Sequence, residues 1–463
     1  MSTKEIIPAA KKNNERKLIK LFLLAILIIG AEVFFNLAGY YIIYAVLLIF
    51  FGLVLFRDRL WFLLVLSIPA LAYGQFIYFP ITVNWIYEAS LTEVLIILVF
   101  LIFIVDKFLN GELKKIRTNG LLYLLFFYLA ISLLSFFNIM DFRLYVTGLK
   151  TIVFGFLAYF LSLNLLDNKK KINMFIYSLG ATSLILAGQL FIKFYQIGWS
   201  EKFFFERSSI AIPLGAIATT AAILALILPI VLSHYFYLDK ENKMRPLLFI
   251  GFSAGLLAVF LTLGKAAILS LAIGFGYLFI KMKNKRIIFI LALASFIIFN
   301  FIFFSAFFNG LLERISHAFV GANIQFRILE YQAGWKIIKD HFWFGIGAGQ
   351  QLDYFKKILN YSSNRLVVNN NNFFLQAWID FGLIGLALAA SIFVNIYKRA
   401  VSFSKSLKKT KLILGLGFIS AMIVSFINGL AEVTFFALPY AIIFWSITGV
   451  FYNLEKYDIS HNN

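Results

Sequence analysis

Three cations in this chain stand where a charged side chain needs a partner. Arg207, Lys265 and Arg327 lie at the ends of apolar segments, and a charge in such surroundings is costly unless it is paired or bound to a ligand. Guanidinium groups form bidentate contacts with phosphate oxygens, and a lysine supplies a compact positive charge. If the three side chains converge in space, they suit an anionic ligand at the membrane surface.

Each of these cations also has a simpler structural explanation. Arg207 follows Glu206 directly, so the two side chains could form an ion pair at the rim of the protein. Arg327 precedes Glu330 by three residues, a spacing that stabilises a helix. Lys265 interrupts two apolar segments with no carboxylate nearby in the sequence. The case for a ligand is therefore strongest at Lys265.

Other polar residues nearby are candidates for binding or proton transfer. The ordinary pKa of histidine makes His341 available for proton transfer, although a histidine at a helix end is also a common hydrogen bonder. Asn371 and Asn372 could contact a ligand or form the N-capping turn of the next helix. Asp380 and Glu432 lie near or within apolar segments, where a carboxylate is either functional or paired with a cation.

These candidates surround residues 308–372, the one long polar stretch of the chain. Apolar residues recur there at spacings of three and four, which predicts a helix over residues 322–339 with an apolar face on the membrane. The residues of that stripe are Ile324, Ile328, Tyr331, Trp335 and Ile338. A second amphipathic helix is predicted over residues 351–359, and the aromatic residues 342–344 are typical of a membrane-interface anchor.

Alternating glycines connect the two predicted helices. Gly345, Gly347 and Gly349 favour a tight turn. The pattern follows a helix and lacks the glycine spacing of a dinucleotide-binding fingerprint, so we do not expect it to bind a nucleotide.

The rest of the chain has the composition of a membrane protein. It is 62% hydrophobic and 14% charged, and apolar runs near the length of a bilayer crossing recur from end to end. The 56 phenylalanines suit helix packing better than the alternating pattern of a barrel. We therefore predict an all-α, polytopic helical membrane protein with about 12 to 14 transmembrane helices. The candidate spans are residues 19–38, 40–56, 60–79, 90–105, 120–138, 148–166, 174–195, 214–236, 247–263, 266–280, 287–307, 373–397, 412–430 and 436–453.

The basic residues predict the orientation of these helices. With a cytoplasmic N-terminus, most Lys and Arg residues fall in the cytoplasmic connections, as the positive-inside rule requires. This arrangement predicts a cytoplasmic tail (1–18), helices 1–11 (19–307), a large extracytoplasmic loop (308–372), C-terminal transmembrane helices (373–454) and a cytoplasmic tail (455–463). We therefore expect the cytoplasmic (inner) membrane as its location, with membrane lipids as partners. The net charge of +20 follows topology, so it does not indicate nucleic acid.

The chain contains no cysteine and only four histidines. This composition excludes Cys-ligated zinc and iron–sulfur clusters and disfavours a His-rich metal site. No Walker A sequence, serine nucleophile elbow or HExxH motif occurs. We expect neither a metal nor a cofactor.

Several motifs in one order resemble the O-antigen ligase and O-antigen polymerase family. The motifs are Arg207-x5-Pro213, Thr262-x-Gly264-Lys265, Arg327-x7-Trp335-x4-Asp340-His341-x3-Gly345-Ile346-Gly347 and Asn371-Asn372-x9-Gly382-Leu383-Ile384-Gly385. The resemblance covers roughly residues 200–390. Two departures stand out, because the ligases carry His at the position of Asn371 and usually Arg at the position of Lys265. Since Asn cannot accept a proton as a base, the ligase role of that His does not transfer.

The resemblance implies a membrane glycosyltransferase with an undecaprenyl-pyrophosphate-linked oligosaccharide as donor and a glycan or lipid as acceptor. A sugar hydroxyl would attack the anomeric carbon, and Arg327, Arg207 and Lys265 would stabilise the departing pyrophosphate without a metal. His341, Glu330 and Asp380 remain alternative proton acceptors. Expected substrate contacts are Asn371, Asn372, His341, Glu330, Trp335, Gly345 and Gly347, with carbohydrate stacking on Trp335 or Trp343.

Three alternatives to a polysaccharide polymerase stay open. One is ligase-type transfer of the glycan to a lipid or protein acceptor. Another is a transporter or flippase of the lipid-linked glycan, which should carry charges through the membrane midplane. In a noncatalytic scaffold, Arg207 and Arg327 should be replaceable by Gln without loss. The unexplained cations lie at outer helix ends, which favours the transferase.

Overall fold

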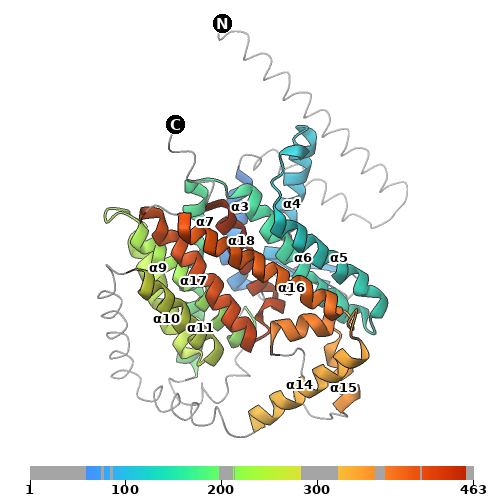
Figure 1. Cartoon of the computed structure of the whole chain (residues 1–463). Helices are drawn as coiled ribbons and strands as arrows, with labels where there is room; N and C mark the ends of the chain where they lie inside the picture. Colours follow the sequence, from blue (N-terminus) through green and yellow to red (C-terminus); the bar gives the residue numbers. More distant parts are fainter. Residues whose placement is uncertain are drawn as a thin grey trace.

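The computed structural model describes residues 59–74, 78–83, 87–197, 212, 214–282, 322–359, 371–406 and 409–454. In these residues the protein has the fold of an all-α membrane protein (Figure 1). Its helices are α3 (Leu60–Ala70), α4 (Leu91–Leu109), α5 (Gly120–Leu134), α6 (Phe142–Leu165), α7 (Lys169–Gln196), α9 (Ile217–Tyr237), α10 (Arg245–Leu261), α11 (Lys265–Lys281), α14 (Ala322–Asp340), α15 (Gln351–Leu359), α16 (Phe373–Ser406), α17 (Lys409–Ala431) and α18 (Leu438–Leu454). Four short 3-10 turns supplement them: Leu71–Tyr73, Leu113–Lys115, Ser135–Asn138 and Thr434–Phe436.

Within the described ranges, 6 helical segments are long and apolar enough to cross a membrane: 120–138, 142–165, 169–196, 217–237, 373–404 and 413–431. Shorter apolar helices occupy residues 60–73, 245–261 and 438–454. The predicted spans 19–38, 40–56 and 287–307 lie outside the described residues, so the total of 12 to 14 stays a prediction.

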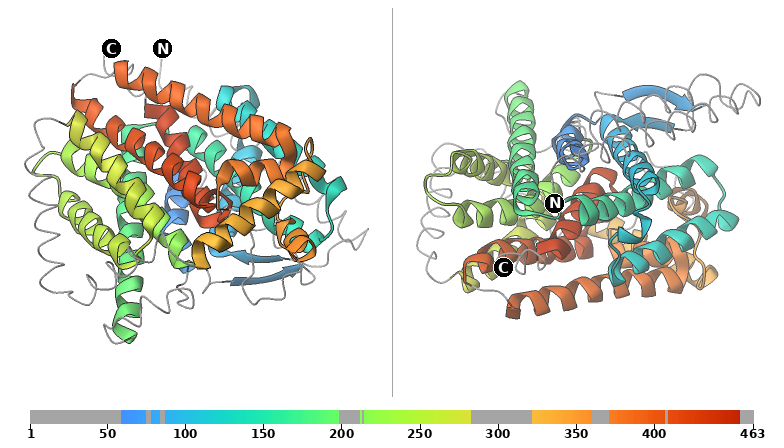
Figure 2. Two further views of the ribbon diagram at one scale, coloured as in Figure 1. Left: turned by 60° about the horizontal axis from the view of Figure 1, so that its bottom comes forward. Right: turned by 90° about the horizontal axis from the view of Figure 1, so that it is seen from above.

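The predicted span 60–79 is wrong at its C-terminal end. Helix α3 ends at Ala70, directly after Pro69. The chain then forms an antiparallel pair of strands, β1 (Tyr78–Val83) and β2 (Tyr87–Ser90), whose register pairs Tyr78 with Ser90 (Figure 2). Ser90 then caps α4 in a capping box with Glu93. β-Branched and aromatic residues in this segment favour a strand as much as an apolar helix, which hydropathy alone does not distinguish.

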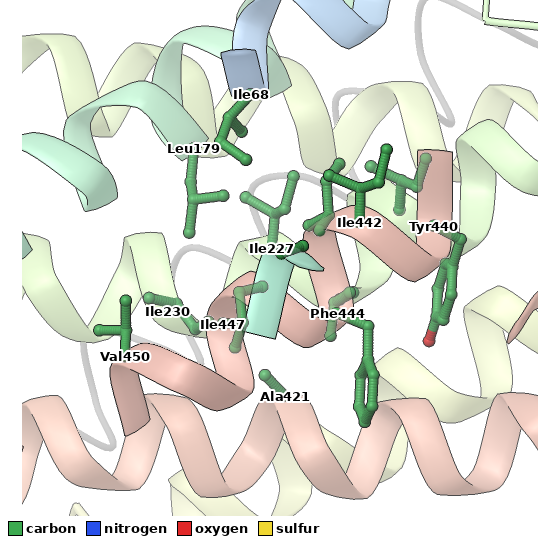
Figure 3. Close-up of a cluster of buried hydrophobic side chains, with 14 of the residues drawn as sticks. Ile68, Leu179, Ile227, Ile230, Ala421, Tyr440, Ile442, Phe444, Ile447 and Val450 are labelled. Atoms are coloured by element: carbon green, nitrogen blue, oxygen red, sulfur yellow. The ribbon is translucent and has the colours of Figure 1, made fainter. Parts of the chain in front are cut away.

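Helix α9 is the centre of the bundle and is buried on all sides. It packs against α17, α10, α7 and α11, and residues 220–234 are all buried. A helix that is apolar around its whole circumference is expected to be buried in this way. Its Ile227 and Ile230 lie with side chains of α3, α7, α17 and α18 in one cluster (Figure 3).

Small residues allow the helices to approach closely. A Cβ atom built on Gly251 of α10 would lie 2.6 Å from the Gly180 carbonyl oxygen of α7. A Cβ on Gly449 of α18 would lie 2.8 Å from Ser162 of α6. Because lipid tails are as apolar as the helix surfaces, close packing of this kind supplies much of the helix association in a membrane.

A second, smaller core lies outside the main bundle. It joins α14, the turn after it, α15 and the first part of α16, which lie together at one end of the molecule (Figure 1). Its buried members are Ala333, Ile337, Ile338, Ile346, Phe355 and Ile379. Both helices of the polar stretch therefore form where the sequence predicts them, at 322–340 and 351–359.

The apolar stripe predicted to lie on the membrane is mostly on the exposed side of the first helix and is not the face that packs on the protein. Ile328, Tyr331 and Trp335 are exposed, and of the described stripe residues only Ile338 is buried. The buried face instead contains Glu330, Ala333, Gly334, Ile337 and Ile338. The buried face is therefore rotated by about one residue, roughly 100°, from the predicted stripe. It carries small residues and a hydrogen-bonded carboxylate, which a search for large apolar side chains does not detect.

Two glycine-containing turns interlock beside this small core. Gly345 has a φ of 65°, and Gly382 interrupts α16 with a φ of 67° and a ψ of −166°. The Ile346 and Gly347 amides donate to the carbonyl oxygens of Ile379 and Asp380 at 3.0 and 2.9 Å. This ladder fixes the end of α14 to the break in α16.

Substitution of Gly382 by alanine is expected to lower the yield of folded protein strongly. The backbone conformation of Gly382 is almost restricted to glycine and costs other residues about 1–3 kcal/mol, and a Cβ atom would lie 2.1 Å from the Trp343 carbonyl group. The measurement is the monodisperse fraction of detergent-extracted protein and its Tm. Gly276→Ala is the matched control, because nothing lies within 4 Å of a Cβ there. Equal Tm values for the two variants would contradict this role of Gly382.

Candidate functional site

Three helix ends meet around Arg327, a group of residues that we call the α14 junction. Arg327 lies near the start of α14, and its guanidinium Nη2 is 3.5 Å from Glu432 Oε1, just after the end of α17. Its Nη1 donates to the Ala431 carbonyl oxygen, also at 3.5 Å. The Arg327 side chain is 44% exposed and that of Glu432 is 29% exposed. Such an exposed, long ion pair contributes about 1 kcal/mol or less, so a stronger anion can displace Glu432.

The start of α16 supplies the other side of the junction. Asn371 Nδ2 donates to Glu330 Oε2 at 2.9 Å, and Glu330 lies one helical turn after Arg327 on α14. Asn372 Nδ2 donates to the Leu430 carbonyl oxygen at 3.1 Å, which joins α16 to α17. The junction therefore brings Arg327, Glu330 and Asn371 together, three residues that the sequence nominated separately.

Glu330 has an unusual environment for a carboxylate. It is 4% exposed. Burial raises its pKa above the ordinary value, while the Asn371 hydrogen bond and the nearby Arg327 charge act in the opposite direction and Glu432 raises it further. A carboxylate with a raised pKa beside a cation in a partly exposed junction is a candidate for proton transfer.

Lys265 begins α11 after a tight turn. Leu263 in this turn has a φ of 49°, which is strained for a residue with a branched side chain, and Thr262 Oγ1 accepts from the Gly264 amide at 3.2 Å. Lys265 is exposed and lies at the positive end of the helix dipole, where a cation does not stabilise the helix. Ser420 Oγ of α17 donates to the Gly274 carbonyl oxygen of α11. Antiparallel packing of α11 on α17 therefore places Lys265 at the same end of the bundle as Glu432.

The other candidates for proton transfer lie away from the junction. His341 follows the C-terminal end of α14, with its ring 5.4 Å from that of Tyr354, and is about 16 Å along the helix from Glu330 at the usual rise. Asp380 is 1% exposed and accepts from Gln376 Nε2 at 2.8 Å. Arg207 lies outside the described residues. Of the alternatives left open by the sequence, the structure brings only Glu330 to Arg327.

Some predicted substrate contacts have structural tasks. Asn372 Oδ1 accepts from the Phe374 and Leu375 amides, both at 3.0 Å, so it caps α16 as the alternative interpretation required. Gly345 is packed against the Asp380 backbone, and Gly347 against Ile139 and the Ser135 carbonyl oxygen. These glycines allow close backbone packing, and a role in substrate binding is not needed to explain them.

Aromatic rings form an exposed row beside the junction. The ring of Trp335, which is 49% exposed, lies 5.9 Å from Trp378, and Trp378 lies 5.7 Å from Phe342. Phe342 in turn contacts Trp343, which is 59% exposed. Trp378 was not predicted from the sequence, and its indole N–H is buried without a hydrogen-bond partner within the described residues. Trp378 follows Asn371 by seven residues, or about two helical turns, so the sequence could have placed both on one face of the helix.

Fold and site together define a multi-pass membrane protein with a charged junction at one end of its helical bundle. A model of the family described as O-antigen ligase matches residues 247–390, from α10 to the middle of α16. This match confirms the resemblance seen in the sequence motifs and supports the O-antigen ligase family. Among curated proteins, none matches the chain. The match supports a glycosyl-transferring enzyme of ligase or polymerase type, with a lipid-linked glycan donor and an acceptor in general terms.

Proposed function

We propose that the protein polymerises or transfers a glycan carried on a polyprenyl pyrophosphate, undecaprenyl pyrophosphate in particular, at the extracytoplasmic face of the membrane. The observation that carries the proposal is the convergence of Arg327, Glu330 and Asn371 at one exposed junction. The family match supports the class of reaction. The junction supplies a cation, Arg327, for the negative charge of the departing pyrophosphate, and a carboxylate, Glu330, for the proton of the attacking hydroxyl.

In the proposed reaction, a hydroxyl oxygen of the acceptor sugar forms a bond to the anomeric carbon of the donor. The bond between that carbon and the pyrophosphate oxygen breaks, and the pyrophosphate leaves with the bonding electrons. Arg327 replaces its weak contact with Glu432 by a charge-assisted contact with the departing pyrophosphate. Lys265 and Arg207 are proposed to approach the same anion. Glu330 accepts the hydroxyl proton, and Asn371 holds its carboxylate in place.

This assignment of charge makes the reaction independent of a divalent metal, since cationic side chains stabilise the leaving group. The exposed rings of Trp335 and Trp343 are proposed to stack against the glycan. A polymerase is favoured over a ligase because Asn stands at the position where the ligases carry His. Ligase-type transfer to a lipid or protein is the second candidate.

The experiment that tests the proposed class is extension of purified undecaprenyl-pyrophosphate repeat units by the purified protein, with and without EDTA. A ladder of products on a gel is expected in both reactions. A ladder that disappears with EDTA would refute metal independence, and no product from intact donor would refute polymerisation.

The proposed orientation is tested by labelling a chain that has no cysteine of its own. Lys336 on α14 and Lys170 at the start of α7 are both exposed. In intact cells, Lys336→Cys should react with a membrane-impermeant maleimide, whereas Lys170→Cys should react only after permeabilisation. The reverse pattern would place the α14 junction in the cytoplasm.

The pH dependence of transfer should follow the ionisation of Glu330. As the pH falls through its raised pKa, the carboxylate takes up a proton and can no longer accept one, so the rate should fall on the acid side. The Asn371 hydrogen bond lowers this pKa. Asn371→Ala should therefore raise it and move the acid limb to higher pH, with a much smaller loss at the plateau than Arg327→Ala. An unmoved acid limb would separate Asn371 from this ionisation.

A further inference from the structure

A polar cleft lies at the end of the bundle remote from the α14 junction. It has a volume of about 390 Å³, and its lining includes Arg117, Asn119, Asn395, Lys398, Arg399 and Asn453. Helix α18 begins at Leu438, six residues after Glu432 of the junction, and its Asn453 at the cleft lies about 22 Å along the helix from Leu438. The cleft is therefore separate from the site described above.

The lining of this cleft is positively charged. Arg117, Lys398 and Arg399 contribute three cations, and none of the lining residues is acidic. The carboxylate next to the cleft is Asp167, which is 2.8 Å from Lys171 Nζ and 3.8 Å from Arg117 Nη2. The cleft thus keeps an excess of positive charge that suits an anion.

The two arginines are held in defined positions. The Arg399 guanidinium lies 5.2 Å from the centre of the Tyr452 ring, and its Nη2 donates to the Tyr452 carbonyl oxygen at 3.4 Å. Arg117 Nη1 donates to Asn453 Oδ1 at 3.3 Å. Tyr452 is itself fixed, because its hydroxyl donates to Asn395 Oδ1 at 2.6 Å. Positioned guanidinium groups lose little side-chain entropy on binding, which favours a planar, bidentate contact with phosphate oxygens.

The helix termini at the cleft also favour an anion. Helix α5 begins at Gly120, with Asn119 Oδ1 accepting from the Leu122 amide at 2.9 Å, so the positive end of its dipole adjoins the cleft. The carbonyl oxygens at the C-terminal end of α6 would repel an anion. Asn453 Nδ2 instead donates to the oxygens of Ser162, Leu163 and Leu166, at 3.2, 2.9 and 3.0 Å. Asn453 is 3% exposed, so a buried amide separates these carbonyls from the cleft.

We propose that this cleft binds a phosphate group, provided by the headgroup of an anionic phospholipid or by free phosphate. Its walls are the start of α5, the ends of α6 and α18 and the later part of α16, and α5, α6 and α16 include segments long and apolar enough to span a membrane. Basic clefts between helix ends recognise anionic headgroups in this way. The proposal is independent of the proposed glycan transfer, because none of its residues belongs to the α14 junction.

The test compares two probes on the purified full-length protein: phosphatidylglycerol in mixed micelles, with phosphatidylcholine as the zwitterionic reference, and inorganic phosphate, with chloride at equal ionic strength. Bound lipid is counted by native mass spectrometry, and phosphate binding is followed as a rise in Tm. Phosphatidylglycerol binding above the reference identifies a lipid site, whereas a specific phosphate effect alone identifies a soluble phosphate site. Binding of neither probe above its reference would overturn the proposal.

Variants locate the binding in the cleft. Lys398→Gln removes an exposed cation and leaves the packing intact, and Arg399→Gln removes the cation stacked on Tyr452. Each should weaken binding by about tenfold, the usual effect of one charge-assisted contact. Lys114→Gln, an exposed cation that does not line the cleft, should bind as the wild type does. If Arg399→Gln fails to fold, Lys398→Gln alone decides, and wild-type binding by that variant would overturn the assignment to the cleft.

Discussion

Replacement of Arg327 by alanine is expected to lower the rate of glycan transfer by about 100- to 1000-fold, the usual effect of removing one donor that stabilises developing negative charge. The departing pyrophosphate carries that charge in the proposed reaction. Since Arg327 is held by contacts of 3.5 Å to Ala431 and Glu432, its loss should alter the reaction much more than the fold. The measurement is the initial rate of glycan extension at equal amounts of folded protein.

Two variants give this prediction its controls. Lys336→Ala removes an exposed cation from the same helix and should leave the rate unchanged. Arg327→Lys keeps the charge but loses the bidentate geometry, so its rate should lie between those of the wild type and Arg327→Ala. Wild-type activity of Arg327→Ala would exclude Arg327 from the stabilisation of the leaving group.

Replacement of Glu330 by glutamine is expected to lower the rate by about 100- to 10,000-fold, the range for loss of a general base. The substitution preserves size and leaves an oxygen that can accept the Asn371 hydrogen bond of 2.9 Å. It removes the negative charge and with it the capacity to accept a proton. The acid limb of the pH profile should disappear together with most of the activity, because no carboxylate remains there to ionise.

The matched control is Glu112→Gln. Glu112 is ion-paired with Lys107 and Lys115 between α4 and α5, remote from the α14 junction, and its replacement should not affect transfer. A Glu330→Gln variant that retains both its rate and its acid limb would show that another group accepts the proton. In that case, a water-assisted or strongly dissociative reaction would replace the proposed one.

The positions of the helices could be predicted from the sequence better than the faces they bury. The polar helix predicted at 322–339 is observed at 322–340, because its spacing of apolar residues and the glycines after it are local signals. Its buried face depends on what packs against it. Glu330 is buried because Asn371, 41 residues later, provides a hydrogen bond, and no local pattern reveals that contact. Trp335 is exposed because smaller residues on the other side of the helix form the buried face.

The candidate site was predicted in part. Arg327, Glu330 and Asn371 could be nominated because polar groups are rare in an apolar chain and therefore conspicuous. Their convergence could not be predicted, because it depends on the break in α16 at Gly382 and on the meeting of three helix ends. Glu432 was noted as a carboxylate near an apolar segment, but its pairing with Arg327 joins residues 105 positions apart. The cleft beside Arg399 escaped notice because its cations resemble ordinary orienting charges.

The measurement that tests the central claim most directly is the stoichiometry of the reaction. Purified protein is incubated with a doubly labelled donor, one label in the glycan and another in the polyprenyl chain, and both products are quantified over time. We expect one polyprenyl pyrophosphate to be released for each new glycosidic bond, in the wild type and in Lys336→Ala but not in Arg327→Ala. Glycan that remains attached to its lipid while the donor crosses the membrane would contradict glycan transfer and identify a transporter.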